Sequence, residues 1–255
     1  MKKVLIGSFV LLASVMLVAC GSSSNNANNA KSSSALEASK DSSSSKSDDS
    51  TDTLKSLNEL AERGESTKEL YVTGKMKVGT DDTIKPGIYD LVIKGGDGNI
   101  MGDRADVDAL DINWIGGVQG NEGGDDSTFR VILFQGDDLD FSSISKVQFT
   151  AIKDAKESDR LGQGEYVVGR DIAAGTYKLS TNTKLDPEYD NLGWHISTYD
   201  DNTADTQTVD LTPGSSDVAV ELTDGEIVTT AYDGDTGDSG SADKTKLIFT
   251  PVNQK

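Results

Sequence analysis

One sequence pattern occurs twice in the chain, and it restricts the possible folds more than any other feature. Residues 78–91 and 168–179 share the order V-G-x-D followed by I-x-[AP]-G-x-Y-x-L, and the first copy has a two-residue insertion between the parts. The shared glycines, Gly87 and Gly175, each precede an aromatic segment and suit a turn that a side chain would strain. The pattern therefore predicts a strand–turn–strand corner that the chain forms twice.

Further landmarks follow each copy in the same order. One of the two tryptophans, Trp114 or Trp194, comes next, and each copy closes with an apolar segment, residues 145–152 or 245–252. Recurrence of several landmarks in one order is typical of an internal repeat. It predicts two related domains, each long enough for its own hydrophobic core, joined by a charged linker. The predicted domains span residues 67–153 and 160–255.

The segments from Leu70 onward have the composition of strands. Short runs of β-branched, aromatic and aliphatic residues alternate with clusters of Gly, Asp and Asn, and no long helical periodicity interrupts them. Examples are residues 89–93, 129–134, 146–150, 218–222 and 247–249. We predict an all-β fold in which each domain is a small β-sandwich or barrel.

The repeated pattern resembles a V-G-x-D-I-x-A-G-x-Y repeat of surface proteins and lipoproteins of Gram-positive bacteria. The resemblance covers both predicted domains, and it implies an extracytoplasmic β-module without a known chemistry. The first copy departs from the pattern at the insertion of Asp82 and Thr83. We therefore expect a looser corner in the first copy.

The amino terminus has the organisation of an export signal. Residues 1–3 carry two lysines, and residues 4–19 form an apolar run that is shorter than the roughly 20 residues of a membrane-spanning helix. The run ends in residues 17–20, Leu-Val-Ala-Cys, which resemble the lipobox of bacterial lipoproteins.

The lipobox resemblance implies a covalent modification and a location. In that family a peptidase cuts before the cysteine, here between Ala19 and Cys20, and the cysteine thiol receives a diacylglyceryl group. Residues 1–19 are then a signal peptide, and the palmitate-type lipid on Cys20 anchors the chain at the extracytoplasmic face of the cell membrane. Cys20 is the only cysteine, so the chain forms no intrachain disulfide.

Two segments separate Cys20 from the predicted domains. Residues 20–50 are rich in Ser and Asn and hold too few apolar side chains to offset their ordering entropy, so they predict a disordered tether. Residues 51–66 bring leucines at helical spacing and a glycine near the end, which predicts a short amphipathic helix.

Charge and composition exclude several classes of function. The formal net charge is −19, which argues against nucleic acid as a partner because phosphate contacts need clustered lysine and arginine. The only histidine is His195, and the first copy has Ile115 at the comparable place of the tryptophan alignment. A side chain that the two copies exchange for isoleucine is not expected to be a catalytic base. With one histidine and a lipidated cysteine, zinc sites are not expected either. We predict a protein that is not an enzyme.

Calcium is the cofactor that the sequence allows us to consider. Asp233, Asp235 and Asp238 alternate with small residues in a turn-forming loop. The loop departs from the EF-hand pattern because Gly237 takes a ligand position and no glutamate closes it. A solvated loop is the favoured interpretation, and no cofactor is predicted.

The predicted function is a non-enzymatic binding or display module at the cell envelope, with a cell-wall polymer or a surface protein as partner. Trp114, Trp194 and Tyr199 are candidate ligand-binding aromatics, although core packing of both tryptophans is the favoured interpretation. A carboxylate-dependent glycan hydrolase is the second hypothesis for the whole protein. The solute receptor of a transporter is the third, although such receptors have α/β lobes.

Overall fold

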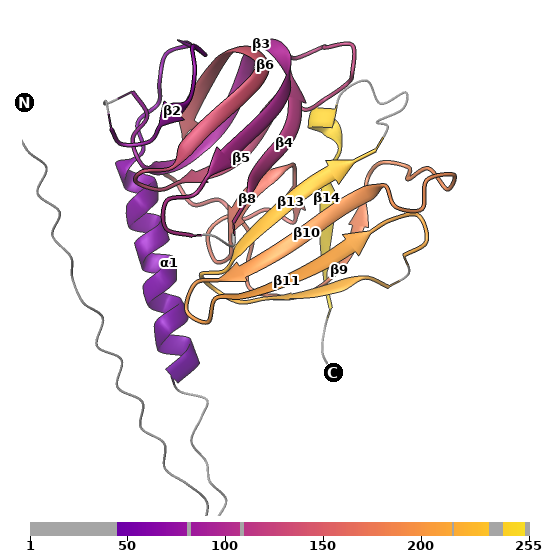
Figure 1. The fold of residues 1–255 in the computed structure, drawn as a ribbon. Coiled ribbons are helices and arrows are strands. Elements are labelled where there is room, and N and C mark those ends of the chain that lie inside the picture. The colour runs from indigo at the N-terminus through magenta and orange to yellow at the C-terminus, as the bar shows by residue number, and fades with distance from the viewer. Residues whose placement is uncertain (1–44, 81–82, 108–109, 216, 235–241, 253–255) are drawn as a thin grey trace, which may run out of the picture. The chain divides into compact units, whose positions relative to one another are not determined.

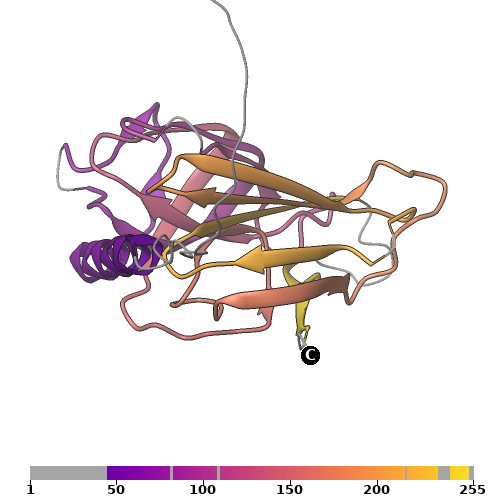
Figure 2. The same cartoon turned by 90° about the horizontal axis from the view of Figure 1, so that it is seen from below.

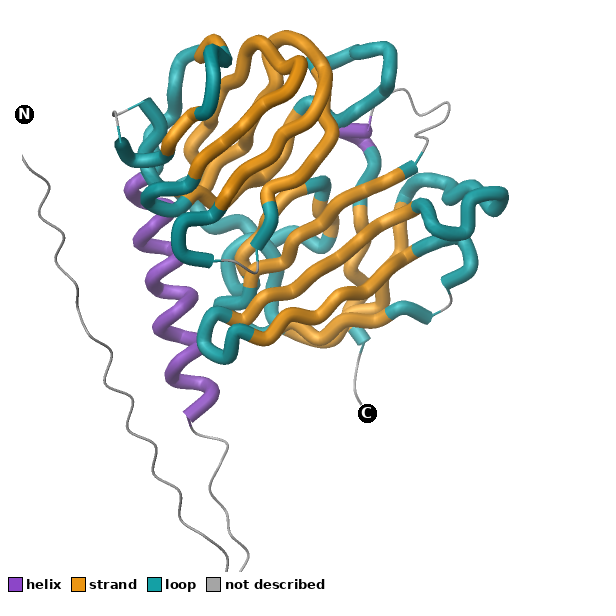
Figure 3. Tube along the Cα trace, in the orientation of Figure 1, coloured by secondary structure: helices purple, strands orange, loops and turns teal. Residues whose placement is uncertain are grey.

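The chain folds into strands and one long helix (Figures 1 and 3). The computed structural model describes residues 45–80, 83–107, 110–215, 217–234 and 242–252. The predicted signal peptide, Ala19 and Cys20 lie outside these residues. The strands form one 10-stranded and one 4-stranded sheet, which confirms the all-β prediction. Within the described part of the chain, no helix has the length and apolar character needed to cross a membrane.

In the first half of the β-structure, two long strands pair along most of their length and bend together. Its elements are β1 (Leu70–Tyr71), β2 (Met76–Lys77), β3 (Gly87–Asp103), β4 (Ile112–Gly117), β5 (Thr128–Leu133) and β6 (Asp138–Ala151). The register between β3 and β6 shifts at three places between Ile93 and Asn99. Here Gly96 has a φ of 82°, and a Cβ on it would lie 2.3 Å from the carbonyl oxygen of Ser143. The glycine therefore permits the close approach at which both strands bend.

In the second half, shorter strands that belong to two sheets take the places of these long strands. Its elements are β7 (Arg160–Leu161), β8 (Gly164–Val167), β9 (Gly175–Thr181), β10 (Gly193–Asp200), β11 (Asp205–Leu211), β12 (Ala219–Leu222), β13 (Ile227–Asp233), the 3-10 helix η2 (Ala242–Lys244) and β14 (Leu247–Pro251). The sheet of four strands has the order β12-β9-β14-β7.

The two halves pair their strands in the same arrangement. The beginning of β3 lies between β5 and the end of β6, as β9 lies between β12 and β14. The end of β3 lies between β4 and the beginning of β6, as β10 lies between β11 and β13. The short strands β1 and β2 pair with β6, as β7 and β8 pair with β14 and β13.

The repeated sequence pattern forms the same corner in both halves. The Gly79 N–H donates to the carbonyl oxygen of Ile84 at 2.7 Å, and the Gly169 N–H donates to that of Ile172 at 2.7 Å. Both glycines have positive φ, 74° and 82°. Each corner thus needs a backbone conformation that other residues rarely adopt, which explains the glycine of the V-G-x-D motif.

The tyrosine of the pattern closes each corner. The Tyr89 hydroxyl donates to the carbonyl oxygen of Lys85 at 2.7 Å, and the Tyr177 hydroxyl donates to that of Ala173 at 2.8 Å. Each ring also meets a phenylalanine edge-to-face, with the ring centroids 5.8 Å apart. The tyrosines therefore combine a buried ring with a satisfied hydroxyl at the edge of the core.

The tryptophans, by contrast, do not occupy matching places, so this landmark of the alignment was wrong. Trp194 lies on β10, whereas Trp114 lies on β4 opposite Ile100 of β3. Because β4 corresponds to β11, the residue in the place of Trp114 is Val209, which lies opposite Ile196. The tryptophans fill two cores in different ways.

The helix α1 (Ser45–Arg63) is longer than predicted and packs against both halves (Figures 1 and 2). It begins before residue 51 and ends at Arg63, so residues 45–50 belong to the helix and not to the tether. Leu57, Leu60 and Ala61 are buried in a cluster that also contains apolar residues of both halves. Each half has a further core of its own. The helix thus covers the junction of the halves.

Arg170 holds the helix, the connecting segment and the second half together. Its side chain is almost fully buried and donates to Asn58 Oδ1 of α1 at 2.8 Å. It also donates to the carbonyl oxygens of Ile152 and Lys153 at 2.6 and 2.8 Å. A buried guanidinium must find such acceptors, because its desolvation is costly.

The junction of the halves contains one strand pairing and one buried ion cluster. Strand β5 pairs with β8 in parallel at Arg130 and Gly164, so the large sheet continues from the first half into the second. Beside this pairing, Arg104 forms ion pairs with Asp137, at 2.8 Å, and with Glu165. All three side chains are at most 2% exposed. Arg104 therefore ties a carboxylate of each half into one buried cluster.

Candidate functional site

The aromatic residues predicted to bind a ligand are buried. Trp194 is 0% exposed, Trp114 is 3% exposed and Tyr199 is 7% exposed, so they do not form an exposed face. The Trp194 indole N–H donates to Thr181 Oγ1 at 3.0 Å, and the Trp194 ring packs within the second core. Core packing, the favoured interpretation of the two tryptophans, therefore agrees with their burial, and the candidate exposed binding face is not formed by these three residues.

Only one of the three residues considered for metal binding, Asp233, lies in the described structure. Asp233 ends β13, and Asp235 and Asp238 lie outside the described residues. Over the ranges that the structure describes, no group of three or more His, Cys, Asp and Glu side chains is arranged to hold a metal ion. The favoured interpretation of this loop as solvated, and the calcium alternative, both remain untested.

His195 also has a simple structural role. Its Nδ1 lies 2.8 Å from Asp210 Oδ1, and both side chains are exposed on adjacent strands. The strand register places Asn99, and not Ile115, at the corresponding position of the first half. Such an exposed cross-strand pair accounts for the histidine without a catalytic role.

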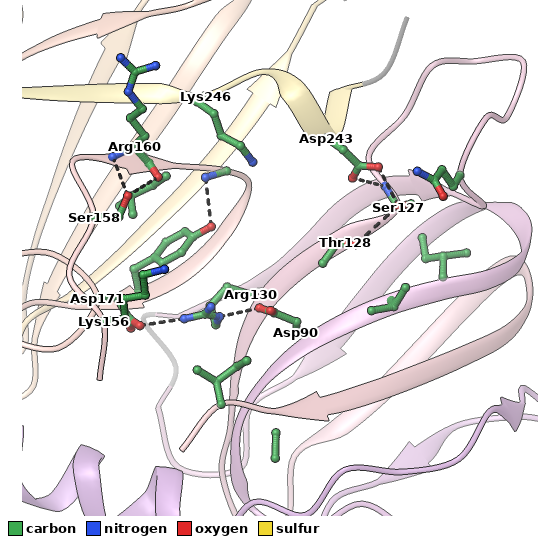
Figure 4. A pocket seen from close by; sticks show the side chains of 18 of the residues that line it. Asp90, Ser127, Thr128, Arg130, Lys156, Ser158, Arg160, Asp171, Asp243 and Lys246 are labelled. Carbon is green, nitrogen blue, oxygen red and sulfur yellow. Dashed lines mark hydrogen bonds and ion pairs between the residues drawn. The ribbon is translucent and has the colours of Figure 1, made fainter. Parts of the chain in front are cut away.

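A cleft of about 980 Å³ lies where the two halves and the connecting segment meet (Figure 4). Strands β3 and β5 of the first half supply one part of its lining, and β7 and the segment before β14 supply another. The connecting segment between β6 and β7 supplies the rest, and the Ser158 N–H fixes it by donating to the carbonyl oxygen of Asp171 at 2.8 Å. Residues far apart in the chain thus meet in one site.

The lining of this cleft is basic although the chain as a whole is acidic. Six cationic and four acidic side chains line it, a net charge of +2, whereas the formal net charge of the chain is −19. The cationic side chains are those of Lys94, Arg130, Lys153, Lys156, Arg160 and Lys246. We call this site the basic cleft.

Arg130 forms the floor of the basic cleft and is already neutralised. Its Nε lies 2.7 Å from Asp90 Oδ1, and its Nη1 lies 2.7 Å from Asp171 Oδ1. The guanidinium also stacks over the Tyr166 ring at 5.5 Å from the ring centroid. Burial raises the pKa of the Asp171 carboxyl, and the positive charge of Arg130 opposes that rise. Arg130 therefore orders the floor and leaves little charge for a ligand.

Four other cations of the basic cleft have no such partner. Among the described residues, no carboxylate oxygen lies within 4.0 Å of the side-chain nitrogens of Lys94, Lys156, Arg160 or Lys246. Lys156 and Arg160 are exposed, while Lys94 and Lys246 are partly buried. Although acidic residues outnumber basic ones in this chain, these four unpaired cations give the described lining of the cleft a local positive charge.

Sequence reasoning did not identify these cations. Lys156 and Arg160 lie in the linker that was recognised only as charged, and Lys94 and Lys246 come from strand regions. The available signal was the spacing of Lys153, Lys156 and Arg160 within a short stretch of an acidic chain. No local pattern connects them to Lys246.

Asp126 is a buried carboxyl group beside the basic cleft, next to Ser127 in its lining. Its Oδ2 accepts a hydrogen bond from Gln163 Nε2 at 2.7 Å, and its Oδ1 has no hydrogen-bond partner among the described residues. Burial, with a smaller contribution from Asp243, raises the pKa of Asp126 to about 7. The folded chain therefore binds this proton more tightly than the unfolded chain.

The consequence is a pH-dependent stability. As the pH rises from about 4 to about 7, the unfolded chain loses the proton first, so the contribution of Asp126 to stability falls. We expect the free energy of unfolding to be about 2–3 kcal/mol higher at pH 5 than at pH 8 from this group. Urea denaturation at both pH values measures the difference, and Asp126→Asn should reduce it. An unchanged pH dependence in the variant would contradict this assignment.

Comparison with models of protein families, with curated proteins and with solved structures finds no significant match. Function must therefore be argued from the basic cleft and from the sequence features described above.

Proposed function

We propose that the chain is an extracytoplasmic lipoprotein, anchored at the cell membrane by lipid on Cys20, that binds an anionic ligand of the cell envelope in the basic cleft. The four unpaired cations of the cleft carry the binding part of this proposal. The lipobox-like residues 17–20 and the single cysteine support the anchor. The Ser- and Asn-rich residues after Cys20 would hold the folded part away from the lipid.

The proposal includes a repeated architecture. The equal strand pairings and the two equal corners support the inference that the halves are copies of one β-module. The basic cleft lies at the junction of the copies, and its lining residues come from both of them. The site thus belongs to the pair of modules and not to each one.

The glycan hydrolase is the alternative that the cleft allows us to weigh. Hydrolysis needs two carboxyl groups that face the substrate, one of them protonated. Asp90 and Asp171 line the basic cleft, but both form ion pairs with Arg130. A third acid, Asp243, accepts hydrogen bonds from the Ser127 N–H and hydroxyl at 2.8 and 2.7 Å. These partners favour binding over catalysis.

One fractionation experiment tests the anchor and the cleft together. Cells fed with labelled palmitate should incorporate the label into the wild-type chain in the membrane fraction, and Cys20→Ala should remain unlabelled. Residues 20–255 with Cys20→Ser should then bind isolated cell envelopes, and the variant Lys156→Glu/Arg160→Glu/Lys246→Glu should not. The reason is that charge reversal repels an anion at three places of the cleft.

A control variant separates the cleft from overall charge. Lys55→Glu/Lys68→Glu/Lys184→Glu makes the same change of net charge at exposed lysines that do not line the basic cleft. It should bind envelopes like the parent. Equal loss in both triple variants would contradict a binding site in the cleft, and retained palmitate label in Cys20→Ala would contradict the anchor.

A further inference from the structure

We propose that the ligand of the basic cleft is a linear polymer with recurring phosphodiester groups, bound through several of its phosphates at once. This inference rests on the proposed function and names the class of its ligand. It follows from where the cations lie, which kinds of cation they are, and which side chains the cleft lacks.

The placement of the cations favours a polymer over a single small anion. The buried cation of the cleft, Arg130, is held by two carboxylates, so no unpaired charge remains at the floor for a small anion to reach. The unpaired cations come from separate elements: Lys94 from β3, Lys156 from the connecting segment, Arg160 from β7, and Lys246 from the residue before β14. The cleft volume of about 980 Å³ is far larger than one small anion, and a single exposed ion pair adds little affinity.

A polymer gains affinity where a single anion does not. Once one phosphate is bound, the next is held close to the next cation, so later contacts form at a high effective concentration. Figure 4 shows Arg160 and Lys246 on the side of the basic cleft opposite Ser127 and Thr128. A chain lying between these two sides would meet ammonium, guanidinium and hydroxyl groups along its length.

The kinds of side chain suit phosphate. Three of the four unpaired cations are lysines, which bind phosphate oxygens as point charges, and the arginine fork binds phosphate in a bidentate way. Of the two arginines that line the basic cleft in the described structure, Arg160 is the one without a carboxylate partner, and it is exposed. A polymer with phosphodiester links also keeps its charge throughout the pH range in which carboxylates gain protons.

The cleft lacks a surface on which bases or sugar rings could stack. Tyr166 is the one aromatic residue among the described residues of the lining, and it is 9% exposed beneath Arg130. Proteins that bind single-stranded nucleic acid combine a basic groove with exposed aromatic side chains. The described lining of the basic cleft therefore offers contacts to backbone charge and no exposed aromatic surface for bases.

The test uses defined probes and residues 20–255 with Cys20→Ser, which differ from the proposed processed chain only in lacking lipid. Fluorescence anisotropy measures binding of an abasic oligodeoxynucleotide, which is a phosphodiester polymer without bases. With three or four phosphate contacts, its affinity should fall about 20- to 50-fold between 50 and 200 mM salt. Competition with inorganic phosphate, poly-glutamate and an oligothymidylate of equal length gives the specificity.

Variants place the binding in the cleft. Lys156→Glu/Arg160→Glu/Lys246→Glu should lose at least ten-fold in affinity for the abasic oligomer, and the control Lys55→Glu/Lys68→Glu/Lys184→Glu should bind within about two-fold of the parent. Thermal unfolding of both variants verifies that they are folded. Equal competition by inorganic phosphate at equal phosphate concentration would overturn the proposal, as would preference for poly-glutamate or for the oligothymidylate.

The result also separates this inference from the proposed function. If envelopes bind in a cleft-dependent way but the abasic oligomer does not, the phosphodiester class is wrong and the anion-binding function stands. If neither binding depends on the cleft cations, both are wrong. If both depend on them, the polymer of the envelope and the defined probe share one site.

Discussion

Replacing Arg104 with alanine should lower the free energy of unfolding by about 3–5 kcal/mol, because a buried ion cluster would lose its only cation. Asp137 and Glu165 are both 0% exposed, and without Arg104 they would be left as two buried carboxylates. Glu165 would keep its hydrogen bond from the Ile132 N–H, which is 2.8 Å long, but not its counter-charge. Denaturant unfolding of residues 20–255 with Cys20→Ser measures the loss.

An exposed ion pair close by in the sequence provides the control. Lys75 Nζ lies 3.2 Å from Asp103 Oδ2, and both side chains are more than half exposed. Lys75→Ala should therefore cost far less stability than Arg104→Ala. If Arg104→Ala costs no more than Lys75→Ala, the buried cluster does not stabilise the junction, and the β5–β8 pairing must hold the halves by itself.

The second large effect is expected at Gly164, where the strands of the two halves meet. Its φ is 134°, and a Cβ on it would lie 2.3 Å from the carbonyl oxygen of Arg130. Gly164→Ala should therefore push β8 away from β5 and lower stability by more than about 3 kcal/mol, since both strain and a backbone clash act there. The same change should weaken envelope binding, because Arg130 and its partners form the floor of the basic cleft.

The first half offers a matched position for comparison. Gly74 precedes β2 by the same interval as Gly164 precedes the corresponding part of β8, and its φ is 150°. A Cβ on Gly74 would meet nothing within 4 Å. Gly74→Ala should cost only the backbone strain, about 1 kcal/mol. Similar unfolding midpoints for Gly74→Ala and Gly164→Ala would show that the strand contact contributes little.

The sequence was informative about local structure. The repeated corner was predicted, but its turn was assigned to Gly87 and Gly175, whereas the structure places the hydrogen-bonded turn at Gly79 and Gly169 of the same pattern. The two tyrosines were recognisable because each closes a corner a few residues away. Strand runs such as residues 129–134 and 247–249 coincide with observed strands, β5 and β14. Local backbone requirements can be recognised in the sequence, because they depend on residues that are neighbours in the chain.

Features that depend on distant contacts were missed. The two tryptophans looked equivalent by their order along the chain. The cross-strand register shows that Val209, and not Trp194, takes the position that corresponds to Trp114. The basic cleft was not foreseen because Arg130 and Lys246 converge only after both halves are folded. The early start of helix α1 was hidden because residues 45–50 have no large apolar side chain and show no helical pattern.

The position of helix α1 has a mechanical consequence for a chain anchored at its amino terminus. A pull on the anchor would reach the folded part at Ser45 and run along the helix. Because Leu57 and Leu60 pack where both halves meet, and because Arg170 bonds to Asn58, that load would be shared between the halves in shear. Drag on a polymer held in the basic cleft would then meet resistance from both β-modules together, and not from the nearer one alone.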